Sequence, residues 1–360
     1  MIQLNSKSLF DVVKDLGAVI KDSHGMPFLR LVRVEFKGNK ITAIGDDLET
    51  RVEVSGEFEG EFEKIFCVDY SLFRKSLASL PNQPIKLIFE KTKLYIKAAK
   101  TEFKLSLEDS GAFPTSKLKF DSPVKLHSAE FIESVLLSSK MIDSKDELSP
   151  LSNIHCCFNG KVSIYGSSHH HGYKQVINQD SKEDKTFLIS SRSAPIMFKM
   201  LSSEEEIELS IEDRAIELKQ ENLRIVTLLP TAKPINIEGL FKSLELDIPL
   251  NVDVEQFYTI IKSLYNFTDV SIKTANLKLS NKKLLISLYD SANIIGCNYE
   301  IDCENDAELD IYYNISNLHK TLSLFSSPDI FITNKKVLYL REGDREALMT
   351  PSQSPKANNS

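Results

Sequence analysis

The sequence predicts an α+β protein of three tandem units, each with two helices packed on antiparallel sheets. The main observation is a helix-and-strand stretch, Ser71 to Phe89, that returns 245 positions later at Ser316 to Thr333. In both copies apolar residues recur at i, i+4 and i+7, on one face of a helix. A weaker copy spans Ser191 to Ile211, at an offset of 124. Three copies favour tandem duplication over a chance amphipathic helix.

The first unit is expected to open with a helix from Ser6 to Lys21. Its lysines at positions 7, 14 and 21 are seven residues apart, almost two turns, so they would form one stripe facing away from the core. A plain solvated face is the alternative interpretation of that stripe. Strand patterns follow at 28–36, 40–44, 51–54 and 65–68, then the repeated helix after Asp69 and three more strands.

The other two units repeat this plan. Gly, Pro and Ser mark linkers at 109–121 and 230–241, and helices are predicted from Ser128 to Met141 and from Asp253 to Tyr265. Strands of the second unit are expected at 154–158, 162–165, 173–177 and 187–189. The predicted domains are therefore 1–115, 116–238 and 239–351, followed by a disordered tail at 352–360.

Composition supports a folded, multidomain chain. The 360 residues, 42% apolar and 26% charged, are too many for one ordinary core and enough for two or three domains. We find no segment apolar enough to span a membrane and no export signal, so we expect a cytoplasmic protein without a membrane partner. The five cysteines form no C-x-x-C pair and are interpreted as reduced core residues.

The net charge of −7 argues against a protein that coats nucleic acid through bulk positive charge, although a local basic surface is compatible with it. Catalytic motifs are absent from the sequence: there is no H-E-x-x-H, G-x-S-x-G or Gly-rich phosphate loop. We therefore expect no enzyme activity and no cofactor. A metal- or nucleotide-dependent enzyme is the alternative that bound zinc or a turnover assay would reveal.

The run His169-His170-His171 is the one candidate for a metal site. On a strand His169 and His171 would share a side, but a third ligand would have to come from elsewhere. Pocket lining or plain surface is the favoured interpretation, and no metal is predicted.

Short strings along the whole chain resemble those of one family in their order and spacing. They are Asp46–Glu49 (for T-D-L-E), Gly111–Pro114 (D-F-P), Ser149–Asn153 (R-P-x-L-x-G), Ile164–Tyr173 (A-T-D-G-H-R-L-A), Tyr313–Ser316 (F-N-x-x-Y) and Leu348–Pro351 (V-M-P-M). The family is the bacterial DNA polymerase III beta subunit, the three-domain sliding clamp. The largest departures are Ser167 to His171 and the last string, which indicate a divergent member.

The resemblance implies a ring that encircles double-stranded DNA without reading its sequence and tethers the replicative polymerase. It implies half of that ring per chain and a head-to-tail homodimer. The helices are expected to line a positive inner surface. Its DNA-facing residues would be Lys7, Lys14, Lys21, His24, Arg74, Lys75, Lys140, Arg192, Lys199, Lys262, His319 and Lys320. The alternative is a clamp-like interaction scaffold that no longer encircles DNA.

The resemblance also implies a pocket for short clamp-binding peptides of the polymerase and the clamp loader. It would be lined by Leu151, Ser167, His169, His170, His171, Gly172, Pro234, Asn314, Asn317, Leu348, Met349, Thr350 and Pro351. For Met349, burial in an ordinary core is the alternative. Ring closure is expected to use Phe103 and Leu105 of one chain and Leu264 and Tyr265 of the other.

Overall fold

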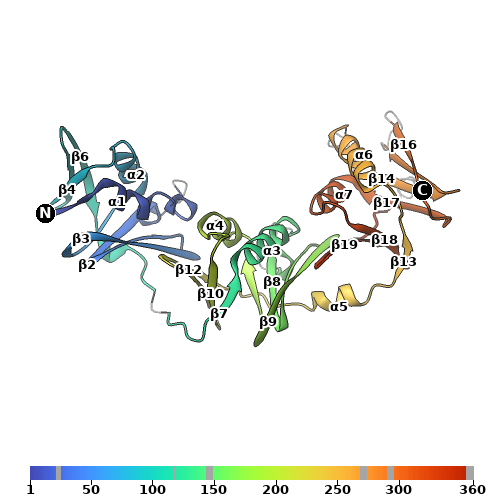
Figure 1. Cartoon of the computed structure of the whole chain (residues 1–360), viewed down its shortest axis with the longest axis horizontal. Helices are drawn as coiled ribbons and strands as arrows, with labels where there is room; N and C mark the ends of the chain where they lie inside the picture. The colour runs from blue at the N-terminus through green and yellow to red at the C-terminus, as the bar shows by residue number, and fades with distance from the viewer. Residues whose placement is uncertain (22–25, 117, 143–148, 268–273, 290–295, 354–360) are drawn as a thin grey trace. The chain divides into compact units, whose positions relative to one another are not determined.

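The computed structural model describes residues 1–21, 26–116, 118–142, 149–267, 274–289 and 296–353. The chain divides into two compact units. One unit combines Met1–Glu133 with Arg192–Pro230, and the other combines Ser134–Ser191 with Thr231–Ser360. Figure 1 labels the helices and strands of both.

The first unit contains a ten-stranded sheet, ordered β1-β4-β5-β6-β3-β12-β11-β10-β7, with β2 paired to β3 beside this path. Its strands are β1 (Ile2–Asn5), β2 (Leu31–Asp46), β3 (Thr50–Asp69), β4 (Pro84–Glu90), β5 (Lys93–Ala98), β6 (Thr101–Glu108), β7 (Val124–His127), β10 (Glu206–Glu212), β11 (Ala215–Gln220) and β12 (Leu223–Leu228). Its helices are α1 (Ser6–Val13), α2 (Tyr70–Ala78) and α4 (Ser193–Met200). Helix α3 (Ser128–Lys140) begins in this unit and ends in the other.

The second unit contains a six-stranded sheet, ordered β13-β18-β19-β20-β9-β8, and a four-stranded sheet, ordered β16-β15-β14-β17. Its strands are β8 (Asn153–Ser167), β9 (His171–Ser190), β13 (Leu246–Pro249), β14 (Thr274–Ser280), β15 (Lys283–Tyr289), β16 (Gly296–Asp302), β17 (Leu309–Asn314), β18 (Asp329–Thr333), β19 (Leu338–Glu342) and β20 (Arg345–Met349). Its helices are α5 (Ile237–Lys242), α6 (Val254–Phe267) and α7 (Ile315–Leu322). All pairings in the described residues are antiparallel, and the α+β prediction is confirmed.

The repeat extends to the way its helices begin. Asp69 caps α2 by accepting a hydrogen bond of 3.0 Å from the Leu72 N–H, and Asn314 caps α7 by accepting one of 3.0 Å from the Asn317 N–H. The two caps are 245 positions apart, the offset of the sequence repeat. A cap of this kind satisfies one of the otherwise unpaired N–H groups of the first turn. In the weaker copy the N-cap residue Arg192 makes no such bond.

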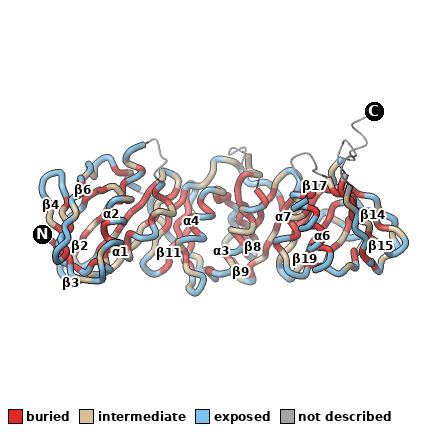
Figure 2. Tube along the Cα trace, turned by 90° about the horizontal axis from the view of Figure 1, so that it is seen from above, coloured by how far each residue is buried: buried red, intermediate tan, exposed pale blue. Residues whose placement is uncertain are grey.

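The apolar faces of the three copies are buried as the spacing predicts. Phe73 in α2, Leu318 in α7 and Met197 in α4 are at most 1% exposed. Figure 2 shows such buried positions recurring along the helices and strands of each unit. The copies are therefore equivalent in packing as well as in sequence.

The first helix is shorter than the sequence predicts. It ends at Val13, and a short 3-10 turn, Leu16–Ala18, follows. The Tyr70 hydroxyl donates to the Lys14 carbonyl at 3.0 Å and accepts from the Gly17 N–H at 2.7 Å. Because these tertiary bonds replace the next helical ones, the lysines at 7, 14 and 21 do not form a single helical stripe.

Two other local predictions need correction. The segment 230–241, expected to be a linker, contains most of helix α5. The separate strands expected at 28–36 and 40–44 are joined in β2, and those at 154–158 and 162–165 are joined in β8. Register shifts at Gly38/Lys40 and around Gly160 mark the places where the sequence suggested a break. A bulge bends a strand without ending it.

We expect Gly166→Ala to destabilise the protein. A Cβ at Gly166 in β8 would overlap the Ser138 carbonyl of α3, which is backbone and has little freedom to move. Overpacking of this kind costs about 1–3 kcal/mol, and we expect the upper end of that range in urea unfolding. Gly172→Ala is the matched control, because its Cβ would meet nothing closer than 3.5 Å. Equal midpoints for the two variants would contradict this packing.

Candidate nucleic-acid interface

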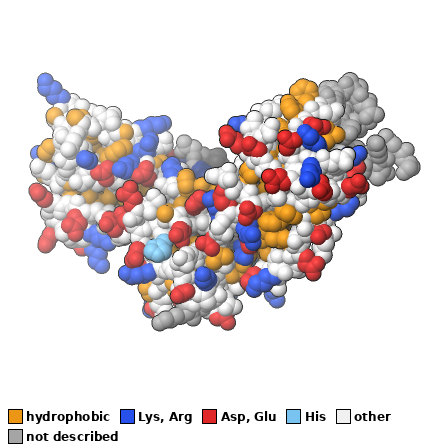
Figure 3. Space-filling view, turned by 45° about the vertical axis from the view of Figure 1, so that its right-hand side comes forward, with side chains coloured by type: hydrophobic (Ala, Val, Ile, Leu, Met, Phe, Trp, Pro, Cys, Tyr) orange, Lys and Arg blue, Asp and Glu red, His pale blue; other side chains and the backbone are white. Residues whose placement is uncertain are grey.

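Three of the cations expected to face DNA line one pocket in the first unit. Lys14 follows α1, Arg74 is on α2 and Lys199 is on α4, and together with Tyr70 they border a cavity of about 340 Å³. All three cationic side chains are exposed. Figure 3 shows Lys and Arg side chains interspersed with Asp and Glu on the face it displays. The pocket is therefore a local concentration of positive charge on an acidic chain.

The pocket is held by contacts between its own walls. The Arg74 Nε donates to the Lys14 carbonyl at 3.0 Å, and Tyr70 bonds the same carbonyl. At Gly17 a Cβ would lie 2.9 Å from the Tyr70 hydroxyl oxygen, so the close approach needs glycine. The end of α1 and helix α2 are thus joined around the guanidinium.

The charge balance of the pocket is positive. The Lys14 ammonium has an exposed ion pair with Asp11 at 3.1 Å, and such exposed pairs contribute little energy. Burial raises the pKa of Tyr70, against smaller opposing effects from the Gly17 N–H and the Arg74 charge. Tyr70 is therefore uncharged at neutral pH, and the pocket is suited to a singly charged oxyanion such as a phosphodiester.

A second set of expected DNA-facing residues meets between α6 and α7 in the second unit. The His319 ring stacks on Tyr265 at 4.4 Å between centroids and on Tyr258 at 5.9 Å. Burial first, and the positive charge of Lys262 second, lower the pKa of His319. His319 is therefore mostly neutral at pH 7 and contributes an aromatic surface, while Lys262 supplies the charge.

The remaining cations of the expected inner surface lie apart from these two groups. Lys7, Lys21, Lys75, Lys140 and Arg192 are exposed, and Lys320 is half-buried. Lys7 borders a smaller cavity of about 140 Å³ beside α1 and α2. His24 lies outside the described residues.

Part of the expected peptide pocket is brought together by one strand ladder. Leu348 and Met349 of β20 pair with Gly172 and His171 of β9, and Ser167 pairs with Gly172 across the β8–β9 hairpin. The Thr350 N–H then donates to the His170 carbonyl at 2.8 Å. The end of the described chain and the histidine run therefore form one surface.

Met349 follows the alternative interpretation. Its side chain is 1% exposed in the large core beneath α6 and α7, so it does not line a surface pocket. Leu348 points to the opposite face and packs, 4% exposed, with Tyr165, Phe241 and Tyr339. Successive residues of a strand point to opposite faces, so only one of this pair could have lined the same side.

The other residues assigned to the peptide pocket have mixed roles. Asn314 is occupied as the cap of α7, where it holds the Asn317 N–H. Leu151 lies half-buried in a 3-10 turn before β8, and Pro234 is exposed before α5. Pro351 is exposed after β20. Leu151 and Pro234 do not belong to the ladder.

The histidine run forms a turn and the start of a strand. His169 and His170 are exposed in the β8–β9 turn, where the Ser168 hydroxyl accepts from the His170 N–H at 3.2 Å, and His171 is buried at the start of β9. His169 and His171 therefore do not share one strand face. Within the described ranges no three His, Cys, Asp or Glu side chains gather in a group that could hold a metal ion.

The residues assigned to ring closure differ in accessibility. Phe103 is half-buried and Leu105 is 8% exposed, both on β6. Leu264 is 1% exposed in the core under α6, so its side chain is not available to a partner, whereas Tyr265 is 38% exposed. Leu264 falls on the apolar i, i+3, i+7 face of α6 with Phe257 and Ile261, which explains its burial.

The chain is similar in structure to solved bacterial proteins over almost its whole length. The DNA polymerase III subunit beta from Pseudomonas aeruginosa matches with a TM-score of 0.91 at 16% identity, covering 98% of this chain and 100% of that one. The beta subunit from DNA polymerase of Streptococcus pyogenes matches at 0.88 and 15% identity, with the same coverage.

The chain has the fold of a bacterial DNA sliding clamp. A putative DNA polymerase III beta subunit from Eubacterium rectale matches at a TM-score of 0.88 and 14% identity, covering 98% of this chain and 100% of that one. No family model and no curated protein matches the sequence. None of the helices formed by the described residues has the length and apolar character needed to cross a membrane.

Sequence reasoning about the sliding-clamp fold identified the cations but missed what positions them. Tyr70 and Gly17 hold Lys14 and Arg74 in place, and neither stands out in the sequence. The Tyr258 and Tyr265 pair could have been found, because a spacing of seven places both on one face of α6. Their partner His319 comes from another helix, and only the fold reveals it.

Proposed function

We propose that this chain is a DNA sliding clamp of the DNA polymerase III beta type. In this proposal two chains close head to tail into a ring around duplex DNA, in the cytoplasm, and tether a replicative polymerase without catalysing a reaction. The ring would contain three domains per chain, at 1–115, 116–238 and 239–351. The observation that carries the proposal is the likeness to DNA polymerase III beta subunits over 98% of the chain.

The arrangement of charge supports DNA as the partner. Lys14, Arg74 and Lys199 come from three different helices and gather at one pocket, although the chain carries a net charge of −7. Contacts from exposed Lys and Arg to phosphates are independent of base sequence and sensitive to salt. A clamp needs such contacts, because it must attract the duplex and still slide.

Two open strand edges support ring closure. β16 is the last strand of the four-stranded sheet. β6 pairs with β3 only through Leu107 and Glu108, which leaves its 101–106 stretch open on that side among the described residues. Unpaired edges of this kind are templates for another strand. We propose that β6 of one chain pairs with β16 of the other.

Charge reversal at the pocket should release DNA. We expect the variant Lys14→Glu, Arg74→Glu and Lys199→Glu to shorten retention on nicked circular DNA. Each lost phosphate contact should reduce the slope of log affinity against log salt by about 0.9. Lys86→Glu, Lys93→Glu and Lys100→Glu make the same change of charge on exposed residues outside the pocket and should retain DNA. Equal loss in both variants would assign binding to net charge and refute the pocket.

Blocking the β6 edge should give a monomer. The Leu107 N–H donates to the Thr92 carbonyl of the neighbouring chain segment, so by alternation the Lys104 N–H points away from β5. Lys104→Pro should therefore spare the β5 ladder and abolish pairing on the open side. Light scattering should give about 40.7 kDa for this variant and twice that mass for wild type and for Lys104→Ala. A wild-type monomer at micromolar concentration would instead favour the scaffold alternative.

We further propose that partners bind through a short peptide at the surface that carries Leu151, Pro234 and the histidine turn. A labelled Q-L-x-L-F type peptide should bind wild type. The pair Leu151→Ser and Pro234→Ser should weaken binding about tenfold by removing accessible apolar contacts. Leu118→Ser, another exposed apolar residue, is the control. Equal affinities in all three proteins, or none in wild type, would exclude this surface.

A further inference from the structure

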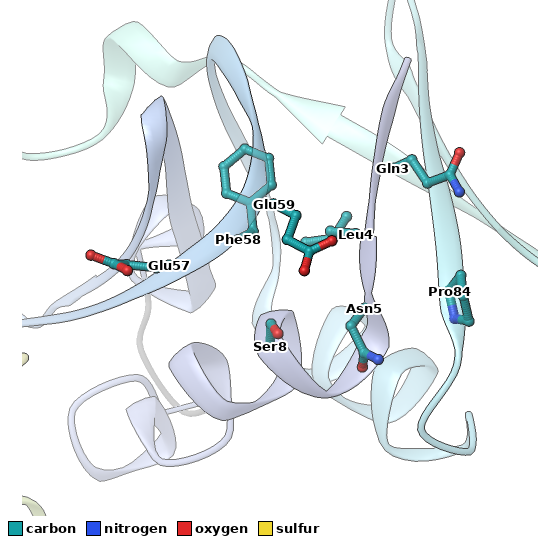
Figure 4. Close-up of a pocket in the computed structure, with 8 residues that line it drawn as sticks. All are labelled: Gln3, Leu4, Asn5, Ser8, Glu57, Phe58, Glu59 and Pro84. Atoms are coloured by element: carbon teal, nitrogen blue, oxygen red, sulfur yellow. The ribbon is translucent and has the colours of Figure 1, made fainter.

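A groove of about 660 Å³ opens in the first unit between β1 and the middle of β3, away from the residues discussed above. Gln3 and Asn5 of β1 and Pro84 of β4 form one wall, and Phe58 and Glu59 of β3 form the other (Figure 4). The volume lies within the 300–1,000 Å³ typical of ligand-binding sites.

The β1 wall presents an unpaired strand edge. Among the described strands β1 pairs only with β4. The Ser6 N–H donates to the Gln83 carbonyl, and hydrogen-bonded pairs alternate in an antiparallel ladder. Leu4 and Ile2 therefore also bond β4, whereas the Gln3 N–H and carbonyl and the Asn5 N–H point away from it. Pro84, which lacks an N–H, stands opposite Asn5 at a position where none is needed.

The β3 wall is rigid and acidic. The Phe58 ring is half-buried and packs edge to face on Phe36 at 5.3 Å between centroids. Glu59 extends beside Phe58 on the side of β1, and Glu57 projects from the other side of the ring (Figure 4). Both carboxylates are exposed, and neither has an ion pair among the described residues. The wall therefore offers an apolar ring between two uncompensated negative charges.

We propose that this groove docks an extended peptide of another protein that carries lysine or arginine. The peptide adds to the edge of β1, taking main-chain hydrogen bonds from Gln3 and Asn5. Its cationic side chains meet Glu57 and Glu59, and their aliphatic stems cover Phe58. Strand addition explains the unpaired edge, and the carboxylates set the charge of the occupant. The site is separate from the proposed DNA and clamp-peptide surfaces and does not depend on them.

The test uses the full chain and fluorescein-labelled peptides in a fluorescence anisotropy titration. The probe is the heptapeptide K-V-K-T-K-V-K, and the comparison peptides are E-V-E-T-E-V-E and the lysine peptide with alternate backbone N-methyl groups. We expect only the unmethylated lysine peptide to bind, with protection of the Gln3 and Asn5 amides in hydrogen exchange. Glu57→Lys with Glu59→Lys should weaken that binding about tenfold, and more at low salt.

The matched control is Glu61→Lys with Glu63→Lys. These exposed glutamates lie on the same strand and give the same change of charge, but they do not line the groove. This variant should bind the lysine peptide within about twofold of wild type. The proposal is overturned if the peptide fails to bind wild type, if both variants lose affinity equally, or if the N-methylated peptide binds as well. Self-association of wild type that Glu57→Lys with Glu59→Lys abolishes would also overturn it, because the occupant would then be a second copy.

Discussion

The ladder between β3 and β12 is the contact on which the first unit depends. It joins Thr50–Val54, from the predicted first domain, to residues 223–227 of the predicted second domain. Thr50, Thr227 and Ser193 close it with a buried triad of hydroxyls at 2.8–3.1 Å. Because β3 also pairs with β2 and β6, one register sets the positions of α1, α2 and α4 together. The cations of the pocket depend on that register for their proximity.

A charged network continues the same ladder on its other side. The Arg224 Nε donates to Glu217 at 2.6 Å and its guanidinium contacts Glu53 at 3.1 Å. Burial opposes the charge on Arg224, but the two carboxylates outweigh it and raise its pKa. A partly buried cation with two partners favours one register, because a slip by one residue would leave charges unpaired. In the second unit the β9–β20 ladder has the equivalent position between predicted domains.

The sequence was sufficient for the fold because its repeat is local. The apolar faces of α2 and α7, and even the caps Asp69 and Asn314, are properties of neighbouring residues. The end of α1 could not be predicted, since it depends on Tyr70, more than fifty positions away. Met349 could not be placed for a similar reason, because the face a strand residue occupies follows from the register of its neighbours. The resemblance supplied the candidate residues, and only tertiary pairing decides which of them meet.

Net charge is therefore a poor guide to what this chain attracts. Screening limits exposed charges to about 8 Å at physiological salt, so a ligand responds to its nearest groups and not to the total of −7. Lys14, Arg74 and Lys199 share one pocket, while Glu57 and Glu59 flank a groove on another part of the same unit. Strands place the acidic residues and helix ends place the basic ones. An acidic protein with this separation can hold an anion on one surface and a cationic peptide on another at the same ionic strength.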